Sequence, residues 1–434
     1  MEEGFPKLRI TKRALVCNFL NLLGGSLTAQ GISLAVLLLT ARHLGAERYG
    51  QYAASITITG STAVLFNLGL DIWLLRNGAI SSASLPTLAR SVFTIKSAFG
   101  GIWFLLICTL LQFLNRERFP AGLVELSAVF VWLNGLFSTV LTLYKLSLRN
   151  GFTFFLQSLY VLTWLAATLI VILRKEQNPW VYMQARVFAI FIAVVSGYII
   201  LLKIGLLFPQ MIHPPVAIHK TLKETIPYAW SEALAWILMR ADTLIIALML
   251  GDGETGIFST AENVVNALFF IPAAAYDVFV PVLSLFLKND LARARFLIKY
   301  GVFLFLLIGF LLTLLVLICA SPLTSLLGAN FQEVQKLLLI LSPVPFLHSL
   351  VFGMAVFLVA SGKQKQRTLI QALVAMLNVV TNALVAKPFG IKGVGIVYVF
   401  TELALLLGYF VISRDAISHL IRGKVYASAQ RSCD

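Results

Sequence analysis

Apolar runs of about 20 residues recur along the whole of this 434-residue chain, and each is long enough to cross the roughly 30 Å hydrocarbon layer of a bilayer as a helix. Of all residues 59% are hydrophobic and only 12% are charged, whereas soluble domains carry about a quarter charged residues. No soluble fold has enough interior to bury so much apolar surface. The sequence therefore predicts an all-α integral membrane protein.

Charged residues, prolines and glycines divide the apolar runs into twelve predicted transmembrane helices. The first run follows a polar, basic N-terminus, is too long for a signal-peptide core and lacks a convincing cleavage site, so we expect it to remain as a helix. The twelve helices are predicted at residues 14–40, 52–75, 92–114, 121–144, 151–173, 180–205, 226–250, 257–286, 297–320, 334–360, 367–386 and 393–413.

The net charge of +15 is distributed unevenly along the chain. Most Lys and Arg residues lie in the N-terminus, the C-terminus and alternate loops, which by the positive-inside rule places both termini in the cytoplasm. Lys96, Lys203, Lys299 and Arg367, near the ends of predicted helices, are counted with the adjoining loops. This leaves Arg186, Arg240 and Lys336 as the basic residues counted inside predicted helices. The basicity therefore indicates membrane topology rather than nucleic-acid binding.

A proline-rich connection at residues 208–223 separates six predicted helices from six, which predicts an N-lobe at 1–212 and a C-lobe at 213–434. The halves resemble each other at a constant offset of about 206 residues. Because each half has an even number of helices, both start on the same side, and the halves are expected to be parallel repeats with a central site between them. The aligned positions are Leu44-Gly45, Gly50 and Tyr52 with Leu250-Gly251, Gly256 and Phe258, and Asp71-Ile72-Trp73 with Asp277-Val278-Phe279.

Four of the repeated glycines have a structural interpretation. Gly45 and Gly251 are expected to end a helix in the left-handed conformation, where glycine costs least. Gly50 and Gly256 are expected to let the next helix start close by.

Several stretches resemble the polysaccharide flippases of the multidrug/oligosaccharidyl-lipid/polysaccharide exporter superfamily, in particular the O-antigen translocases. Each stretch is rich in small and apolar residues, and it is their order, spacing and twelve-helix frame that carry the resemblance. The stretches are Leu44 to Tyr52, Asn67 to Asp71 with Arg76, Ala241-Asp242-Thr243, Leu250-Gly251 through Phe258 to Ala261, Pro281 to Ser284, and Phe389 to Gly395 before Glu402.

This resemblance implies two six-helix lobes in a V around a central cavity that opens alternately to each side of a bacterial inner membrane. The implied substrate is a polyprenyl-pyrophosphate-linked oligosaccharide of a pathway such as lipopolysaccharide synthesis. Membrane lipids and the pathway's polymerase or glycosyltransferases are the implied partners. Family members often hold the pyrophosphate with basic residues in the first helices, whereas the first helix here has none after Arg13.

Ionisable residues inside predicted helices are the candidates for the substrate cavity, because each costs about 2.5–3.5 kcal/mol at the bilayer centre unless it is paired or hydrated. Glu232, Trp236 and Arg240 fall on one helical stripe. Either this stripe faces the cavity, or Arg240 pairs with an acid of a neighbouring helix. Asp242 points away from Arg240 and is expected to bond an adjacent helix.

Two further candidates lie in other helices. Arg186 is expected either to receive an anionic substrate or to extend its side chain to the interface. Glu402, near the middle of the last helix, is expected either to carry a coupling proton or to neutralise Lys336 or Arg240.

Charges at helix ends have milder interpretations. Asp71 and Asp277, at equivalent cytoplasmic helix ends, are predicted to act in a gate or a helix cap, with Arg76 or loop lysines in reach of Asp71. Glu262 is predicted to interact with the positive end of its helix. Bends are expected where proline removes helix hydrogen bonds, at Pro272, Pro343 and Pro345.

Two other functions are compatible with parts of the sequence. A cation-coupled multidrug antiporter would share the lobes but needs acidic residues in the cavity. A membrane-embedded glycan polymerase usually needs a long outer loop, and none is predicted. There is no P-loop for ATP, no metal-ligand spacing among the four Cys and five His residues, and no catalytic constellation, so we expect a transporter without a cofactor rather than an enzyme.

Overall fold

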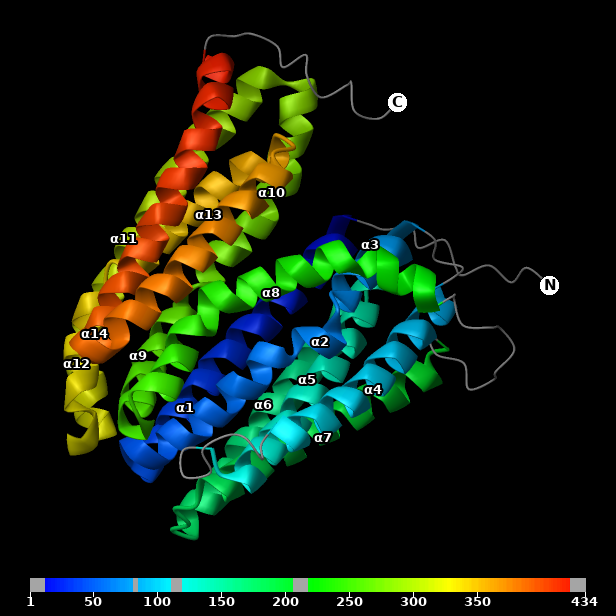
Figure 1. The fold of residues 1–434 in the computed structure, drawn as a ribbon. Coiled ribbons are helices and arrows are strands. Elements are labelled where there is room, and N and C mark those ends of the chain that lie inside the picture. The colour runs from blue at the N-terminus through cyan, green and yellow to red at the C-terminus, as the bar shows by residue number, and fades with distance from the viewer. Residues whose placement is uncertain (1–11, 81–84, 111–118, 206–217, 422–434) are drawn as a thin grey trace. The chain divides into compact units, whose positions relative to one another are not determined.

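The computed structural model describes residues 12–80, 85–110, 119–205 and 218–421, and within these ranges the regular structure is entirely helical. Figure 1 shows the helices in chain order. Their bounds are α1 (Lys12–Thr62), α2 (Val64–Asn67), α3 (Leu70–Ile80), α4 (Leu85–Leu110), α5 (Ala121–Leu146), α6 (Asn150–Leu173), α7 (Pro179–Lys203), α8 (Ile218–Met249), α9 (Asp252–Leu268), α10 (Phe270–Asn289), α11 (Leu291–Leu327), α12 (Gln332–Leu341), α13 (Val344–Ala360) and α14 (Gln364–Ile421), with a short 3-10 helix at Ala329–Phe331.

The chain forms two compact units. Unit 1 comprises residues 1–236 and 251–256, and unit 2 comprises residues 237–250 and 257–434. The predicted lobe boundary at 212/213 falls in residues 206–217, outside the described residues, and it stays a prediction.

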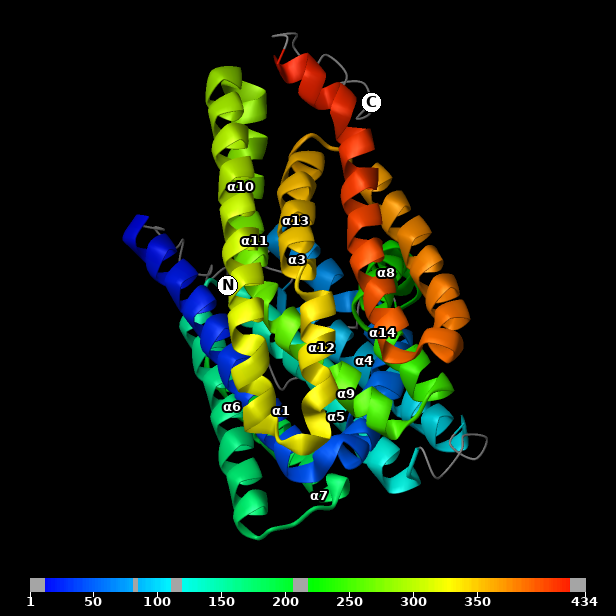
Figure 2. The same ribbon diagram turned by 90° about the vertical axis from the view of Figure 1, so that its left-hand side faces the viewer.

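Each unit is built around one central helix. In unit 1, α5 contacts α1, α3, α4, α6 and α7 (Figure 1). In unit 2, α13 contacts α10, α11 and α14 (Figure 2). Both α5 and α13 lie in the fourth predicted span of their half, and the repeat of the two halves stays a prediction.

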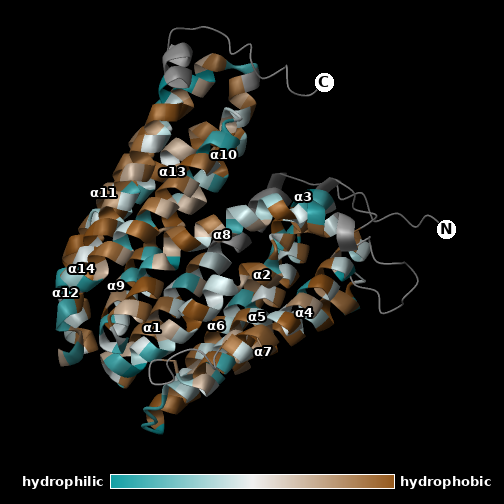
Figure 3. Ribbon diagram, in the orientation of Figure 1, coloured by the Kyte–Doolittle hydropathy of each residue, from teal (hydrophilic) through white to brown (hydrophobic). Residues whose placement is uncertain are grey.

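Apolar length confirms the membrane class. Within the described residues, eight helices are long and apolar enough to cross a bilayer, or nine if the bent pair α12 and α13 forms one span. Hydrophobic residues predominate on α11, whereas hydrophilic residues are visible on the short helix α3 (Figure 3). The chain is a multi-pass membrane protein, and the count of twelve spans stays a prediction.

Several predicted helix boundaries were wrong because the helices are joined by kinks rather than loops. The first predicted helix continues through a kink at Gly45 into the second, and α14 continues through a kink at Gly390. A single residue with a non-helical backbone is enough to turn the chain at these points. Both kinked helices are therefore longer than any predicted span.

Breaks also interrupt the second predicted helix of each half. In unit 1 the break lies at Leu68 and Gly69, which both have positive φ. In unit 2 it lies at Phe269, between α9 and α10, three residues before Pro272. The α12–α13 pair bends by 41° where Pro343 follows α12, so bends occur near the predicted prolines.

The two helix-ending glycines differ. Gly45 has a positive φ of 77°, as predicted, but its ψ of 169° is extended rather than left-handed helical, a combination that glycine alone adopts readily. Gly251 is not among the glycines with positive φ, so that prediction was wrong: α8 ends at Met249 and α9 begins at Asp252 without a left-handed residue between them.

Replacing Gly45 by Ala is expected to lower the free energy of unfolding by about 1 kcal/mol, because a Cβ is unfavourable at positive φ. Gly31 is the matched control: it is an exposed residue of the same helix, and a Cβ there would meet nothing within 4 Å. Gly31→Ala should be neutral or stabilising, since glycine weakens a helix interior. Unfolding by denaturant in detergent micelles measures both, and equal effects would contradict this explanation.

The other repeated glycines lie in direct contact. A Cβ added at Gly50 of α1 would overlap the carbonyl group of Asp252, and one added at Gly256 of α9 would overlap the carbonyl of Ala46. The Gln51 amide also donates a hydrogen bond of 3.0 Å to Asp252. The equivalent glycines of the two halves therefore permit close packing between α1 and the first turns of α9, within unit 1.

Candidate functional site

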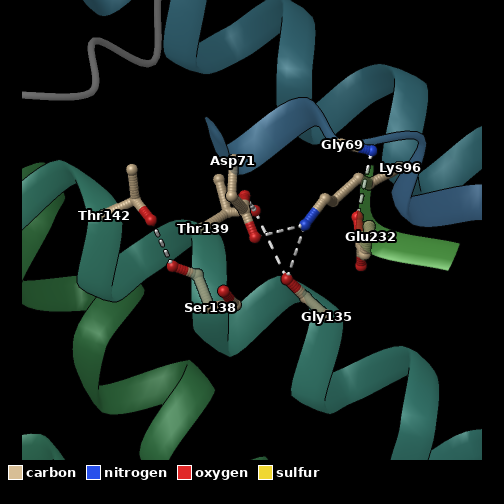
Figure 4. Close-up of polar contacts among 8 residues, drawn as sticks. All are labelled: Gly69, Asp71, Lys96, Gly135, Ser138, Thr139, Thr142 and Glu232. Carbon is tan, nitrogen blue, oxygen red and sulfur yellow. Dashed lines mark hydrogen bonds and ion pairs between the residues drawn. The ribbon is translucent and has the colours of Figure 1, made fainter. Parts of the chain in front are cut away.

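A buried ion pair lies in unit 1 between α3 and α4 (Figure 4). The Lys96 Nζ lies 2.8 Å from Asp71 Oδ2 and also donates a 3.0 Å hydrogen bond to the Gly135 carbonyl. Thr139 of α5 donates to the other carboxylate oxygen of Asp71 at 2.6 Å. The Lys96 side chain is 1% exposed, so its charge depends on Asp71 for neutralisation.

The first part of α8 is attached to this region by three polar contacts. Glu232 accepts a 3.1 Å hydrogen bond from the Gly69 N–H (Figure 4), which is available because the helix is broken there. Trp73 donates to Glu224 at 3.0 Å, and Arg76 donates to the Tyr228 hydroxyl at 2.6 Å. These contacts fix residues 224–232 of α8 against α3.

Of the two kinds of partner predicted for Asp71, the structure has the lysine. Arg76 contacts Tyr228 instead, and the cation beside Asp71 is Lys96, which lies at the start of the predicted helix 92–114 and was counted with the preceding loop. The missed signal is Pro86: proline favours the first turn of a helix, and placing the helix start there would have put Lys96 well inside α4.

Arg186 of α7 is enclosed by aromatic residues of three other helices. Its guanidinium donates to Tyr52 of α1 at 3.1 Å and to Tyr160 of α6 at 3.3 Å. The same group lies 4.2 Å from the ring centre of Phe130 and 4.4 Å from that of Trp164. Arg186 is therefore held inside unit 1 by cation–π and hydroxyl contacts.

No carboxylate of the described residues forms an ion pair with Arg186. A guanidinium has five N–H donors, and in the described part of the chain this one makes two hydrogen bonds to side-chain acceptors. Its positive charge is stabilised by the negative faces of the aromatic rings but is not neutralised by a carboxylate of the described residues. This is the property that an anion-binding arginine requires.

Arg240 has the opposite environment, in unit 2. It pairs with Glu262 of α9 at 2.9 Å and donates to Asn263 at 3.1 Å. Thr243 donates to the same Glu262 oxygen at 2.8 Å, and the Glu262 side chain is fully buried. Of the two possibilities for Arg240, the structure has the pairing, and Glu262 is an ion-pair partner rather than only a residue near the helix end.

Two further carboxylates are buried in unit 2. Asp242 bonds the adjacent helix: Asn378 and Asn382 of α14 both donate to one of its oxygens. Glu402 lies 2.9 Å from His348 Nδ1, and the His348 ring stacks on Phe269 at 3.7 Å.

The predicted neutralisation of Lys336 or Arg240 by Glu402 is not found. Lys336 pairs with Glu333, at 2.7 Å, and Arg240 with Glu262. The partner of Lys336 is three residues away in the chain, and the partner of Arg240 lies on the next helix. Glu402 contacts His348 instead.

The stripe of Glu232, Trp236 and Arg240 does not form one group of contacts. Glu232 contacts the Gly69 backbone, Trp236 lies beside Gly60, and Arg240 bonds α9. Asp277 is exposed on α10. In the described ranges, no three His, Cys, Asp or Glu residues are grouped closely enough to hold a metal ion.

The family model described as "Polysaccharide biosynthesis protein" matches residues 15–287, well over half of the chain. The chain belongs to this family. No curated protein matches this polysaccharide biosynthesis family member.

Solved structures share the family member's fold. An inward-facing multidrug resistance MATE family transporter of the MOP superfamily has a TM-score of 0.71 at 13% identity, covering 91% of this chain and 96% of that one. The lipid II flippase MurJ, in an inward closed conformation, has a TM-score of 0.68 at 12% identity, covering 92% and 88%. The Vibrio cholerae MATE transporter VcmN in the bent form has a TM-score of 0.62 at 13% identity, covering 95% and 99%. At such identities the likeness establishes the fold alone.

Proposed function

We propose that this protein moves a polyprenyl-pyrophosphate-linked oligosaccharide, such as an O-antigen precursor, outward across the bacterial inner membrane by alternating access. Both termini then lie in the cytoplasm, and the glycan polymerase or glycosyltransferases of the pathway are its partners. The family membership supports a role in polysaccharide synthesis, and the fold it shares with a lipid II flippase supports transport rather than catalysis.

The observation that carries the proposal is the contrast between the two intramembrane arginines. Arg240 is neutralised by a buried glutamate, whereas Arg186 has aromatic and hydroxyl neighbours and no carboxylate among the described residues. Arginine binds phosphate through its planar fork of donors. We assign Arg186 to the pyrophosphate and Arg240 to packing within unit 2.

A second candidate is the cation-coupled multidrug antiporter. The buried carboxylates Asp242, Glu262 and Glu402 of unit 2 favour it, because only Glu262 has an arginine partner. In the flippase, these same carboxylates serve packing within unit 2.

The cellular experiment is deletion of the gene in a strain with no redundant transporter. The flippase predicts accumulation of the complete lipid-linked glycan on the cytoplasmic side, with assembled surface polysaccharide lost. If the protein were a glycan polymerase, its deletion would instead leave unpolymerised, single repeat units on the outer side of the membrane. Normal polysaccharide in the deletion strain would contradict both.

Arg186→Gln is expected to reduce outward movement of the glycan by about 10- to 100-fold, since charge-assisted hydrogen bonds contribute about 1.5–3 kcal/mol. Arg186→Lys should retain part of the activity because the charge remains. Arg48→Gln is the matched control, because Arg48 is an exposed arginine of the same unit that bonds Gln177. Equal activity of the Arg186→Gln and Arg48→Gln proteins at equal membrane abundance would remove Arg186 from the pathway.

A further inference from the structure

A pocket of 520 Å³ lies within unit 1, between α2, α4 and the first part of α8. Its volume is within the range of about 300–1,000 Å³ that is usual for small-ligand sites. The walls are almost entirely apolar and include Leu65, Leu68, Phe99, Ile226 and Trp230. Ile226 is 54% and Trp230 67% exposed, so the pocket is open to the surroundings of unit 1. One of its walls, α4, is long and apolar enough to cross a membrane.

The pocket uses a face of α8 that the polar contacts leave free. Residues 222, 226, 229, 230 and 233 line the pocket and share one helical face. Glu224, Tyr228 and Glu232, which bond α3 or Gly69 just before it, lie on average roughly 145° around the helix by the 100° step. The apolar wall is therefore positioned by the contacts of the neighbouring face.

One cation lines the pocket. Lys223 is exposed and near the start of α8, and none of the described hydrogen bonds or ion pairs involves it. Its neighbour Glu224 is bonded to Trp73. An ammonium group beside an apolar pocket matches a ligand with a hydrocarbon chain and an anionic head.

We propose that this pocket binds one acyl chain of an anionic phospholipid of the surrounding bilayer, with the lipid phosphate on Lys223. An acyl chain gains little free energy when it moves from the lipid bilayer into an apolar pocket. The preference for one lipid over another therefore comes from the Lys223 ammonium group. A lysine near the membrane surface contributes enough to favour an anionic over a zwitterionic lipid by about fivefold. The site is separate from Arg186 and does not depend on the transported substrate.

The probe is Trp230 fluorescence in nanodiscs that contain acyl-brominated lipids, because bromine quenches only tryptophans that it contacts. Subtracting the signal of Trp230→Phe from that of the unmodified protein isolates Trp230 from the other six tryptophans. Phosphatidylglycerol is compared with phosphatidylcholine. We expect half-maximal quenching of Trp230 at about fivefold lower mole fraction of the anionic lipid.

Lys223→Gln should remove this preference and leave quenching by phosphatidylcholine unchanged. Lys145→Gln, at an exposed lysine of the same unit outside the pocket, should keep it. Equal quenching by the two lipids, or a preference that survives Lys223→Gln, would overturn the proposal. Displacement of the brominated phospholipid by a polyprenyl pyrophosphate at lower mole fraction would also overturn it, because the transported lipid would then be the occupant.

Discussion

Neutralising Asp71 alone is expected to destabilise unit 1 more than neutralising Asp71 and Lys96 together. Asp71→Asn leaves the Lys96 ammonium, 1% exposed, without a counter-ion, and removing one partner of a buried pair costs about 3–5 kcal/mol. Lys96→Met should cost a similar amount. The double variant should recover most of the loss, because an uncharged pair needs no compensation.

The free energy of unfolding in mixed micelles measures this cycle. Glu333 and Lys336 provide the control pair, since their side chains are 39% and 62% exposed, and exposed pairs contribute little. Additive losses in the Asp71→Asn, Lys96→Met double variant would show that the two groups do not compensate each other, contrary to the structure.

Substitution of Gly50 or Gly256 by valine is expected to abolish stable folding. The added side chain would overlap the backbone of the opposite helix, which cannot move away as a flexible side chain does. Small residues allow such close helix packing in membranes. The measurement is the yield of monodisperse protein after extraction from the membrane.

Gly253→Ala is the matched control for this pair. Gly253 lies in the same helix as Gly256, and a Cβ there would meet nothing within 4 Å. Its yield should equal that of the unmodified protein. Normal yield of Gly50→Val would mean that α1 and α9 do not pack through these glycines.

Much of the fold could be predicted because the bilayer imposes length and polarity on every span. The membrane class follows from the apolar runs, and the bends near Pro272 and Pro343 follow from proline positions. The repeat suggested by the spacing of Gly50 and Gly256 stays a prediction. Loops were predicted around Gly45 and Gly390, where the structure has kinks within continuous helices. A turn made by one residue does not require a polar segment, so the sequence does not distinguish it from a loop.

The partners of the buried charges could be predicted less well. Which helix lies beside Arg186 depends on tertiary packing, so neither its aromatic neighbours nor the Glu402–His348 contact has a local sequence signal. Lys96 was missed for a different reason: it lies close to the start of the predicted helix 92–114 and was counted with the preceding loop, whereas a helix start at Pro86 places it well inside the span.

The most direct test of the central claim is transport by the purified protein in liposomes. A labelled polyprenyl-pyrophosphate oligosaccharide is placed in one leaflet, and its arrival in the other is followed by an impermeant glycan-modifying reagent, with an organic cation assayed in parallel. We expect movement of the glycan, reduced about 10- to 100-fold by Arg186→Gln, and no movement of the cation. Gradient-driven transport of the cation without movement of the glycan would contradict it.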